Sequence, residues 1–514
     1  MAYESDFYIA RIEKEDSKEI NEEFVLPDYQ PEVKKILTCR EAVSLPSVSV
    51  EAGSVTAEGN LRFNVIYVGN DDDLYSAQFE CGYSFSVPGL PQDASISDAV
   101  SVNAESVSAK AVSPRRISVR GRLKALFAVQ SKDGEEECIT ESSLPPSCEA
   151  LCKSVDYTRV VSLDCEMFEL ADEVVNDISA EAPRVICCES NAFVSDTDNV
   201  NGRVNVRGEV TTDILVCDDT RDELPRIIRR KTPFAYTMSE GLARENDMIC
   251  AVVTPTASEC RIEDGGILIN LCCSVKAYAL SLESEMVCTD IYSPRNEITP
   301  NESVFDTYIP IACDNKNMSL NFALSASEAG IAKERKIVCS FASAVCEKIS
   351  VGGENGRESI IGKIVFKLIT ADDSNECADY ECKEIALPFK YDISREMRAI
   401  SADSSSVLFA NASATRTIAR YDGERIGLDT ELSIAFFILK RQKNMGIASI
   451  VLGEKTEKKD ECVRIVYPTI GESLWSVAKR MRMPISSIAA KNGIATDTEK
   501  DSPQSLSGVK YLVI

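Results

Sequence analysis

The sequence predicts a mainly β protein, built from tandem all-β repeat units of the sandwich or barrel type and a small C-terminal βααβ domain. Two observations lead to this fold class. A segment consisting of a glycine, an alternating strand and an acidic turn occurs three times in the 514 residues, and a polar stretch separates the last copy from a segment with helical periodicity. The expected division is three units at 1–150, 151–298 and 299–452, a linker at 453–462 and the small domain at 463–514.

The repeated element contains a glycine and, at a nearly constant distance after it, a phenylalanine. The glycines are Gly59, Gly208 and Gly362, and the phenylalanines are Phe85, Phe234 and Phe389. A glycine inside a strand usually marks close packing, and a phenylalanine at fixed spacing usually fills a core. We therefore interpret both as structural residues.

Each unit also ends in a predicted strand. These late strands span residues 117–127, 267–277 and 426–436. In the first of them, Val119 and Leu123 fall on the same parity, which is the two-residue period of an antiparallel sheet with one buried face.

Composition argues against several classes of function. The formal net charge of −26 repels phosphate groups, so nucleic acids are poor partners. The chain contains no histidine, and histidine is the commonest general base and metal ligand. No carboxylate pair stands out among the 82 acidic residues. We expect a protein that is not an enzyme, with no catalytic residues, no cofactor and no metal site.

The N-terminal residues and the cysteines favour a cytosolic protein. Residues 1–19 contain no apolar export segment, and no stretch approaches the ~18 apolar residues of a membrane span. The 20 cysteines are then expected to be reduced and to serve as small buried hydrophobes. Later oxidative cross-linking and a zinc site are the alternatives, although no CxxC spacing supports zinc.

The last fifty residues have the pattern of a small mixed domain. Residues 463–467 predict a strand, 473–481 and 485–491 predict two helices, and 511–514 predict a closing strand. Asn492-Gly493 suits the left-handed residue that ends a helix.

The first unit resembles the SPOCS domain of clostridial spore-coat proteins. Three segments carry the resemblance, namely residues 26–37, the glycine–strand–turn element that reaches Tyr67, and residues 113–119. The second unit keeps only residues 182–186 of the opening segment. The third unit has lost its proline there and is a divergent copy.

The octapeptide at residues 471–478, GESLWSVA, is similar to the LysM domain. In LysM domains that bind N-acetylglucosamine polymers, two loops line the glycan groove. Carried over to this chain, the partner- or glycan-binding residues are Thr469, Ile470, Gly471, Glu472, Ser473, Leu474, Asn492, Gly493, Ile494 and Ala495. The usual proline-glycine before the last strand is missing and the loop at 496–505 is long, so a protein ligand is at least as strong an expectation as a glycan. Trp475 is expected in the core.

Tandem SPOCS-like units with a C-terminal LysM domain resemble the SipL type of spore morphogenetic protein. The resemblance implies a scaffold in the mother-cell cytoplasm, at the forespore surface and in the spore coat. It also implies a partner, the ATPase-like coat basement-layer protein of the stage IV sporulation protein A type, through which coat layers are localised around the forespore. The alternative is a cell-wall-associated protein that binds peptidoglycan or another N-acetylglucosamine polymer.

Overall fold

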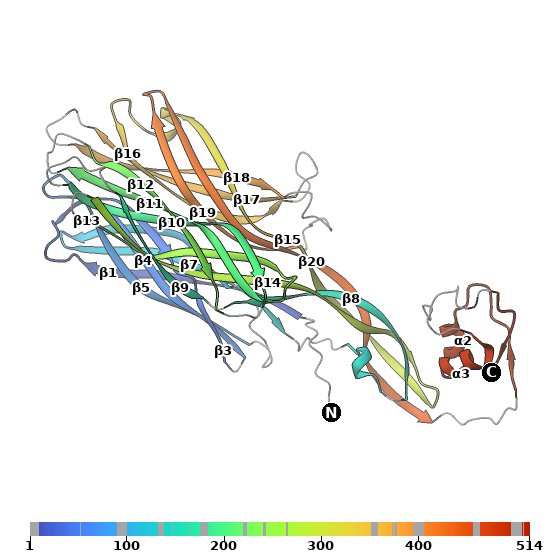
Figure 1. Cartoon of the computed structure of the whole chain (residues 1–514). Helices are drawn as coiled ribbons and strands as arrows, with labels where there is room; N and C mark the ends of the chain where they lie inside the picture. The colour runs from blue at the N-terminus through green and yellow to red at the C-terminus, as the bar shows by residue number, and fades with distance from the viewer. Residues whose placement is uncertain are drawn as a thin grey trace.

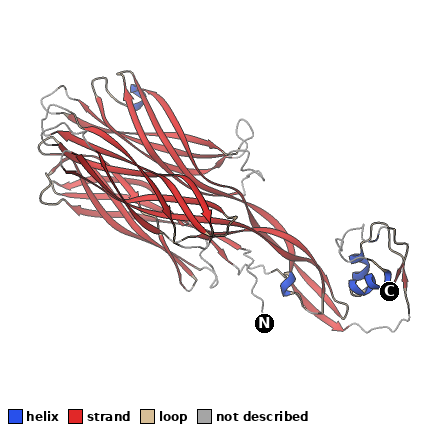
Figure 2. Ribbon diagram, in the orientation of Figure 1, coloured by secondary structure: helices blue, strands red, loops and turns tan. Residues whose placement is uncertain are grey.

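The computed structural model contains antiparallel sheets throughout and short helices mainly near the C-terminus (Figures 1 and 2). It describes residues 10–514 except 52, 90–99, 132–137, 146, 164, 175–182, 219–223, 240–242, 264–265, 351–357, 373, 375–377, 394–405, 456–462, 495–505 and 507. The mainly β class predicted from the sequence is confirmed. The sheets of the described residues are open, and none closes into a barrel.

Unit 1 consists of two sheets that share one hydrophobic core. One sheet has the order β1-β7-β6, and in the other β4 pairs with β2, β3 and β5. The strands are β1 (Ala10–Val25), β2 (Val33–Val43), β3 (Ser47–Glu51), β4 (Ser54–Gly69), β5 (Leu74–Pro88), β6 (Val100–Ser113) and β7 (Arg116–Ser131).

Unit 2 repeats this plan with the sheet β10-β11-β12 and a second sheet in which β14 pairs with β13, β8 and β9. Its strands are β8 (Glu149–Ser162), β9 (Glu166–Val174), β10 (Pro183–Val200), β11 (Arg203–Asp218), β12 (Arg226–Thr237), β13 (Met248–Glu263) and β14 (Gly266–Tyr292). A single turn of 3₁₀ helix, η1 (Glu141–Ser143), precedes it.

Unit 3 has the sheets β15-β20-β19 and β16-β17-β18. Its elements are β15 (Asn296–Ser325), α1 (Ala326–Ala329), β16 (Lys336–Ser350), β17 (Ser359–Asp372), β18 (Asp379–Asp392), β19 (Ser406–Tyr421) and β20 (Arg425–Lys455). The predicted unit boundaries after residues 150 and 298 fall just inside β8 and β15, because these strands begin at Glu149 and Asn296.

The repeat glycines occupy the central strands β4, β11 and β17, each directly opposite an aromatic residue of the next strand. Gly208 faces Phe234 and Gly362 faces Phe389. In unit 1 the residue opposite Gly59 is Tyr83, whereas Phe85 lies opposite Ala57. The three phenylalanines are nonetheless buried, as expected of core residues.

The three units pack side by side around a second core to which all of them contribute. Ile66 of β4, Leu215 of β11 and Ile369 of β17 lie in it, each at the same distance after its repeat glycine. The pairing strands β2, β10 and β16 add further apolar side chains. The described β-strands of the three repeats therefore belong to one body, which Figure 1 shows as a bundle of long strands.

A narrow stalk extends from this body toward the C-terminal domain (Figure 1). We define the stalk as β8 and residues 281–292 of β14, paired with each other, together with the paired residues 296–310 of β15 and 439–455 of β20. Residues 453–455, which the sequence assigned to the linker, instead continue β20, because they remain within the antiparallel pairing with β15. The rest of that linker, 456–462, is outside the described residues.

The C-terminal domain has the predicted βααβ order. It comprises β21 (Ile465–Val466), α2 (Leu474–Met481), α3 (Ile485–Asn492) and β22 (Leu512–Val513), with the two strands antiparallel. Trp475 is buried in its core, as expected. None of the helices in the described part of the chain is long and apolar enough to cross a membrane.

Candidate functional site

The first predicted binding loop of the C-terminal domain lies between β21 and α2. Ile470 at its tip is fully exposed, and Gly471 has a positive φ of 85° that turns the chain into the helix. Ser473 caps α2, because its hydroxyl accepts a 3.1 Å hydrogen bond from the Ser476 N–H. Leu474 points into the core and is 2% exposed. Of these residues, Ile470 is best placed to meet a ligand.

Glu472 holds this loop in shape. Its carboxylate accepts a 2.9 Å bond from the Thr469 N–H and two bonds, of 3.0 and 3.1 Å, from the guanidinium of Arg480. Partial burial alone would raise the pKa of Glu472, but these donors reverse the effect and lower it. The carboxylate is thus charged at neutral pH and occupied by internal partners.

The second predicted loop begins at the end of α3, and its polar residue is also used internally. The Asn492 side chain donates to the carbonyls of Ile488 and Val513 at 2.8 Å and accepts from the Val513 N–H at 2.7 Å. It therefore fastens α3 to the closing strand. Gly493 ends the helix with φ 61°. Ala495 lies outside the described residues.

Helix α2 attaches the C-terminal domain to the stalk. The Asp290 carboxylate of β14 accepts hydrogen bonds from Trp475 Nε1 at 2.8 Å and from Lys479 Nζ at 2.5 Å. The ring of Tyr292 contacts the indole edge-on, with ring centroids 5.1 Å apart. The hydroxyl of Tyr292 donates to the Met483 carbonyl at 2.8 Å. This face of the domain is therefore covered.

Among the described residues, strands β21 and β22 expose an apolar surface that lies outside the two predicted binding loops. We call it the outer apolar face and define it by Val463, Ile465, Tyr467 and Tyr511, which are 54–70% exposed. Ile465 pairs with Val513, so the exposed residues of the two strands are neighbours. In the sequence, the only sign of this face is that Ile465 and Tyr467 alternate with Val466, which is buried. Because all three residues are apolar, the pattern does not show which side of the strand faces solvent.

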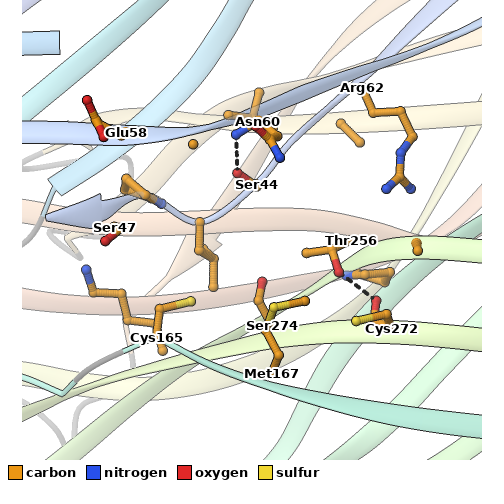
Figure 3. Close-up of a pocket in the computed structure, with 18 of the residues that line it drawn as sticks. Ser44, Ser47, Glu58, Asn60, Arg62, Cys165, Met167, Thr256, Cys272 and Ser274 are labelled. Atoms are coloured by element: carbon orange, nitrogen blue, oxygen red, sulfur yellow. Dashed lines mark hydrogen bonds between the residues drawn. The ribbon is translucent and has the colours of Figure 1, made fainter. Parts of the chain in front are cut away.

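A cleft of about 820 Å³ separates units 1 and 2 (Figure 3). Ser44, Glu58 and Arg62 line one side, and Thr256 and Ser274 line the other. Backbone and hydroxyl hydrogen bonds fix its walls, such as the 2.8 Å bond from the Asn60 N–H to Ser44 Oγ. The lining mixes both charges with apolar groups.

Metal chemistry requires several ligands close together. Within the described ranges, no group of three or more cysteine, aspartate or glutamate side chains lies close enough to hold a metal ion.

Comparison with known proteins adds no relative. No family model, no curated protein and no solved structure matches the chain. The fold and surface define a mainly β protein of three packed two-sheet units, with a βααβ C-terminal domain whose strands carry an exposed apolar face.

Proposed function

We propose that the chain is a non-enzymatic spore-coat morphogenetic scaffold of the SipL type. On this proposal the three units are SPOCS-like sandwiches and the C-terminal domain is LysM-like. The domain binds the ATPase-like coat basement-layer protein of the stage IV sporulation protein A type, in the mother-cell cytoplasm at the forespore surface. The outer apolar face is the observation that carries the proposal.

Such a face favours a protein ligand. Exposed apolar side chains that gather on one small surface are typical of interaction sites, and tyrosine is enriched in the cores of interfaces. The face lies opposite the helices that contact the stalk, so a partner can reach it while the domain stays attached. Arg464 and Lys510 flank it and give it a positive rim, which suits an acidic protein surface.

The predicted loops offer less to a sugar. Glycan recognition depends on polar side chains that hydrogen-bond hydroxyl groups, and Glu472 and Asn492 already have internal partners. A glycan would have to displace bonds that hold the domain together. Protein binding through the outer apolar face requires no such rearrangement.

The test is capture of the basement-layer protein by the full-length chain, run beside a binding assay with N-acetylglucosamine oligomers. The variant is the double substitution Ile465→Ser and Tyr467→Ser, whose side chains are 56% and 70% exposed and are not part of the core. The matched control is Val451→Ser with Leu452→Ser, equally exposed at the end of β20.

We expect capture to fall at least ~10-fold in the outer-face variant, to persist in the control and to be lost when residues 463–514 are removed. Capture that survives the truncation would overturn the role of the C-terminal domain. Sugar binding without protein capture would favour the cell-wall alternative instead.

A further inference from the structure

Six cysteines of the described chain form three contacting thiol pairs. In each pair one thiol lies close enough to raise the pKa of the other, and the pairs are Cys152 with Cys288, Cys188 with Cys260, and Cys250 with Cys313. All three pairs involve unit 2. The first pair lies in the stalk, the second lies within unit 2, and the third joins unit 2 to unit 3.

The stalk pair has the backbone geometry of a cross-strand disulfide. Cys152 of β8 and Cys288 of β14 are directly opposite each other in the antiparallel register. Directly opposed residues have Cα atoms about 4.5–5.5 Å apart, within the range of about 4.4–6.8 Å that a disulfide spans. The other two pairs join strands of different sheets, so no ladder register fixes their separation.

The two thiols of the stalk pair differ in a way that suits stepwise oxidation. Cys288 is fully buried beside Ile291 and Ile447, whereas Cys152 is half-buried at the edge of the same cluster. The hydrogen bond with Cys152, followed by burial, raises the pKa of Cys288 far above its usual range. Cys288 therefore keeps its proton, and the half-buried Cys152 is the thiol that peroxide reaches more readily.

We propose that Cys152 and Cys288 are a redox-sensitive pair that peroxide converts to a disulfide. The Cys152 thiolate attacks the O–O bond of hydrogen peroxide, which forms a sulfenic acid, and the departing hydroxide takes up a proton to become water. The Cys288 sulfur then attacks the oxidised sulfur. The S–S bond forms, the S–O bond breaks and a second water leaves with the Cys288 proton. In total, two thiols and one peroxide give one disulfide and two waters.

The disulfide would brace the strand that carries the C-terminal domain. The register of β14 shifts between Cys288 and Asp290, and Asp290 is the residue that bonds Trp475 and Lys479. A covalent link from Cys288 to β8 fixes the backbone at this bulge. The inference is independent of the proposed coat partner, since it concerns the stalk alone.

The test treats reduced full-length protein with hydrogen peroxide under native conditions. Remaining thiols are then blocked with N-ethylmaleimide, and the digest is analysed by mass spectrometry with and without reductant. We expect a reductant-sensitive cross-linked peptide containing Cys152 and Cys288, lighter than its two reduced components by two hydrogen atoms. The oxidised protein should also have a higher unfolding midpoint, which reductant reverses.

The variants Cys152→Ser and Cys288→Ser should each lose both signals, and Cys346→Ser in unit 3 should keep them. Circular dichroism of each variant checks that the sheets are intact, and the wild-type peptide map stands even if one variant fails to fold. A sulfinic acid at Cys152 without the cross-link, or a cross-link that forms only in denaturant, would overturn the proposal.

Discussion

Three glycines of the central strands are required by the aromatic ring that lies over each of them. A Cβ atom added at Gly208 would lie 2.7 Å from Cζ of Phe234, and one added at Gly362 would lie 2.6 Å from Cε1 of Phe389. Backbone carbonyl oxygens of the neighbouring strand, from Phe193 and Val345, are closer still. Because a backbone oxygen cannot rotate away, alanine at these positions forces the strands apart.

The first prediction concerns the substitution Gly208→Ala. We expect it to lower the free energy of unfolding by about 2 kcal/mol, the usual cost of overpacking a core. Gly427→Ala in β20 is the matched control, since an added Cβ there meets nothing within 4 Å, and it should change stability by less than ~0.5 kcal/mol. Urea denaturation midpoints measure both, and similar values for the two variants would contradict the explanation.

The ionised carboxylate of Asp172 makes the stability of unit 2 depend on pH in the acidic range. Its carboxylate on β9 accepts bonds of 2.9 and 2.8 Å from Arg230 and one of 2.8 Å from Thr232, both on β12, which belongs to the other sheet. The hydrogen bond from Arg230 is the main reason that the pKa of Asp172 falls to about 2. Because the pKa of Asp172 is lower in the folded than in the unfolded protein, the ion pair stabilises the fold fully above the unfolded pKa of ~4. This stabilisation is lost as the pH falls toward the folded pKa of about 2.

The second prediction is that Asp172→Asn removes this dependence. The substitution should cost roughly 1 kcal/mol of stability at pH 7, a figure reduced for the partial exposure of Arg230, and almost nothing near pH 2. Unfolding midpoints measured from pH 7 to pH 2 check it. Parallel pH curves for the variant and the wild type would argue against the ion pair as the cause.

At the scale of elements, the sequence predicts strands well where one face is buried and poorly where two-stranded ribbons form. The late strands expected at 117–127 and 267–277 are the first parts of β7 and β14, each beginning at the second residue of its strand. The predicted strand ends at 277, whereas β14 continues to Tyr292, because its second half pairs with β8 in the stalk. That pairing depends on a partner more than a hundred residues away, which local periodicity does not reveal.

The candidate site shows the same limit. The octapeptide at 471–478 predicted helix α2 and the buried Trp475, since helical periodicity is a local property. The attachment of α2 to Asp290 and the exposure of Tyr467 both depend on how the domain packs against distant residues. No spacing within the sequence carries that information.

The third prediction uses the chain's only tryptophan as a probe of the stalk contact. Asp290→Ala removes the acceptor of both Trp475 and Lys479 and leaves the indole N–H without its partner. We expect the C-terminal domain to detach from the stalk, with a red shift of the fluorescence emission and faster quenching by iodide. Glu297→Gln is the control, because its ion pair with Arg482 is exposed and contributes little. Unchanged emission in Asp290→Ala would mean that the remaining contacts, those of Tyr292 among them, hold the domain without Asp290.

At the scale of the whole molecule, the three units interlock through equivalent positions that carry different side chains. In each unit, one residue pairs with the position that follows the repeat glycine at the same distance. This residue is Arg40 in unit 1, Glu189 in unit 2 and Phe341 in unit 3. Arg40 forms a 3.3 Å ion pair with Glu189 and lies 4.5 Å from the ring centroid of Phe341. The Arg40 side chain of unit 1 thus contacts both unit 2 and unit 3. Sequence comparison of the repeats aligns these positions, but only the packing shows that they meet.

The last prediction follows from the burial of this cluster. The side chains of Arg40 and Glu189 are 13% and 18% exposed, so Glu189→Ala leaves a largely buried charge without its anionic partner, at a cost of about 3 kcal/mol. The loss of this ion pair should weaken the packing of unit 1 against units 2 and 3. Calorimetry should then show one cooperative transition for the three units of the wild type and a broadened or split transition for the variant.

Glu259→Ala removes one member of an exposed ion pair with Arg261 and should leave the transition intact. Three separate transitions in the wild type would mean that the three units unfold independently of one another. The shared core around Ile66, Leu215 and Ile369 argues against that behaviour, because each unit alone would expose its part of an apolar surface that the other two now cover. Cooperative unfolding is therefore the expected consequence of the packing, and Glu189 is the residue whose removal measures how strongly the units are coupled.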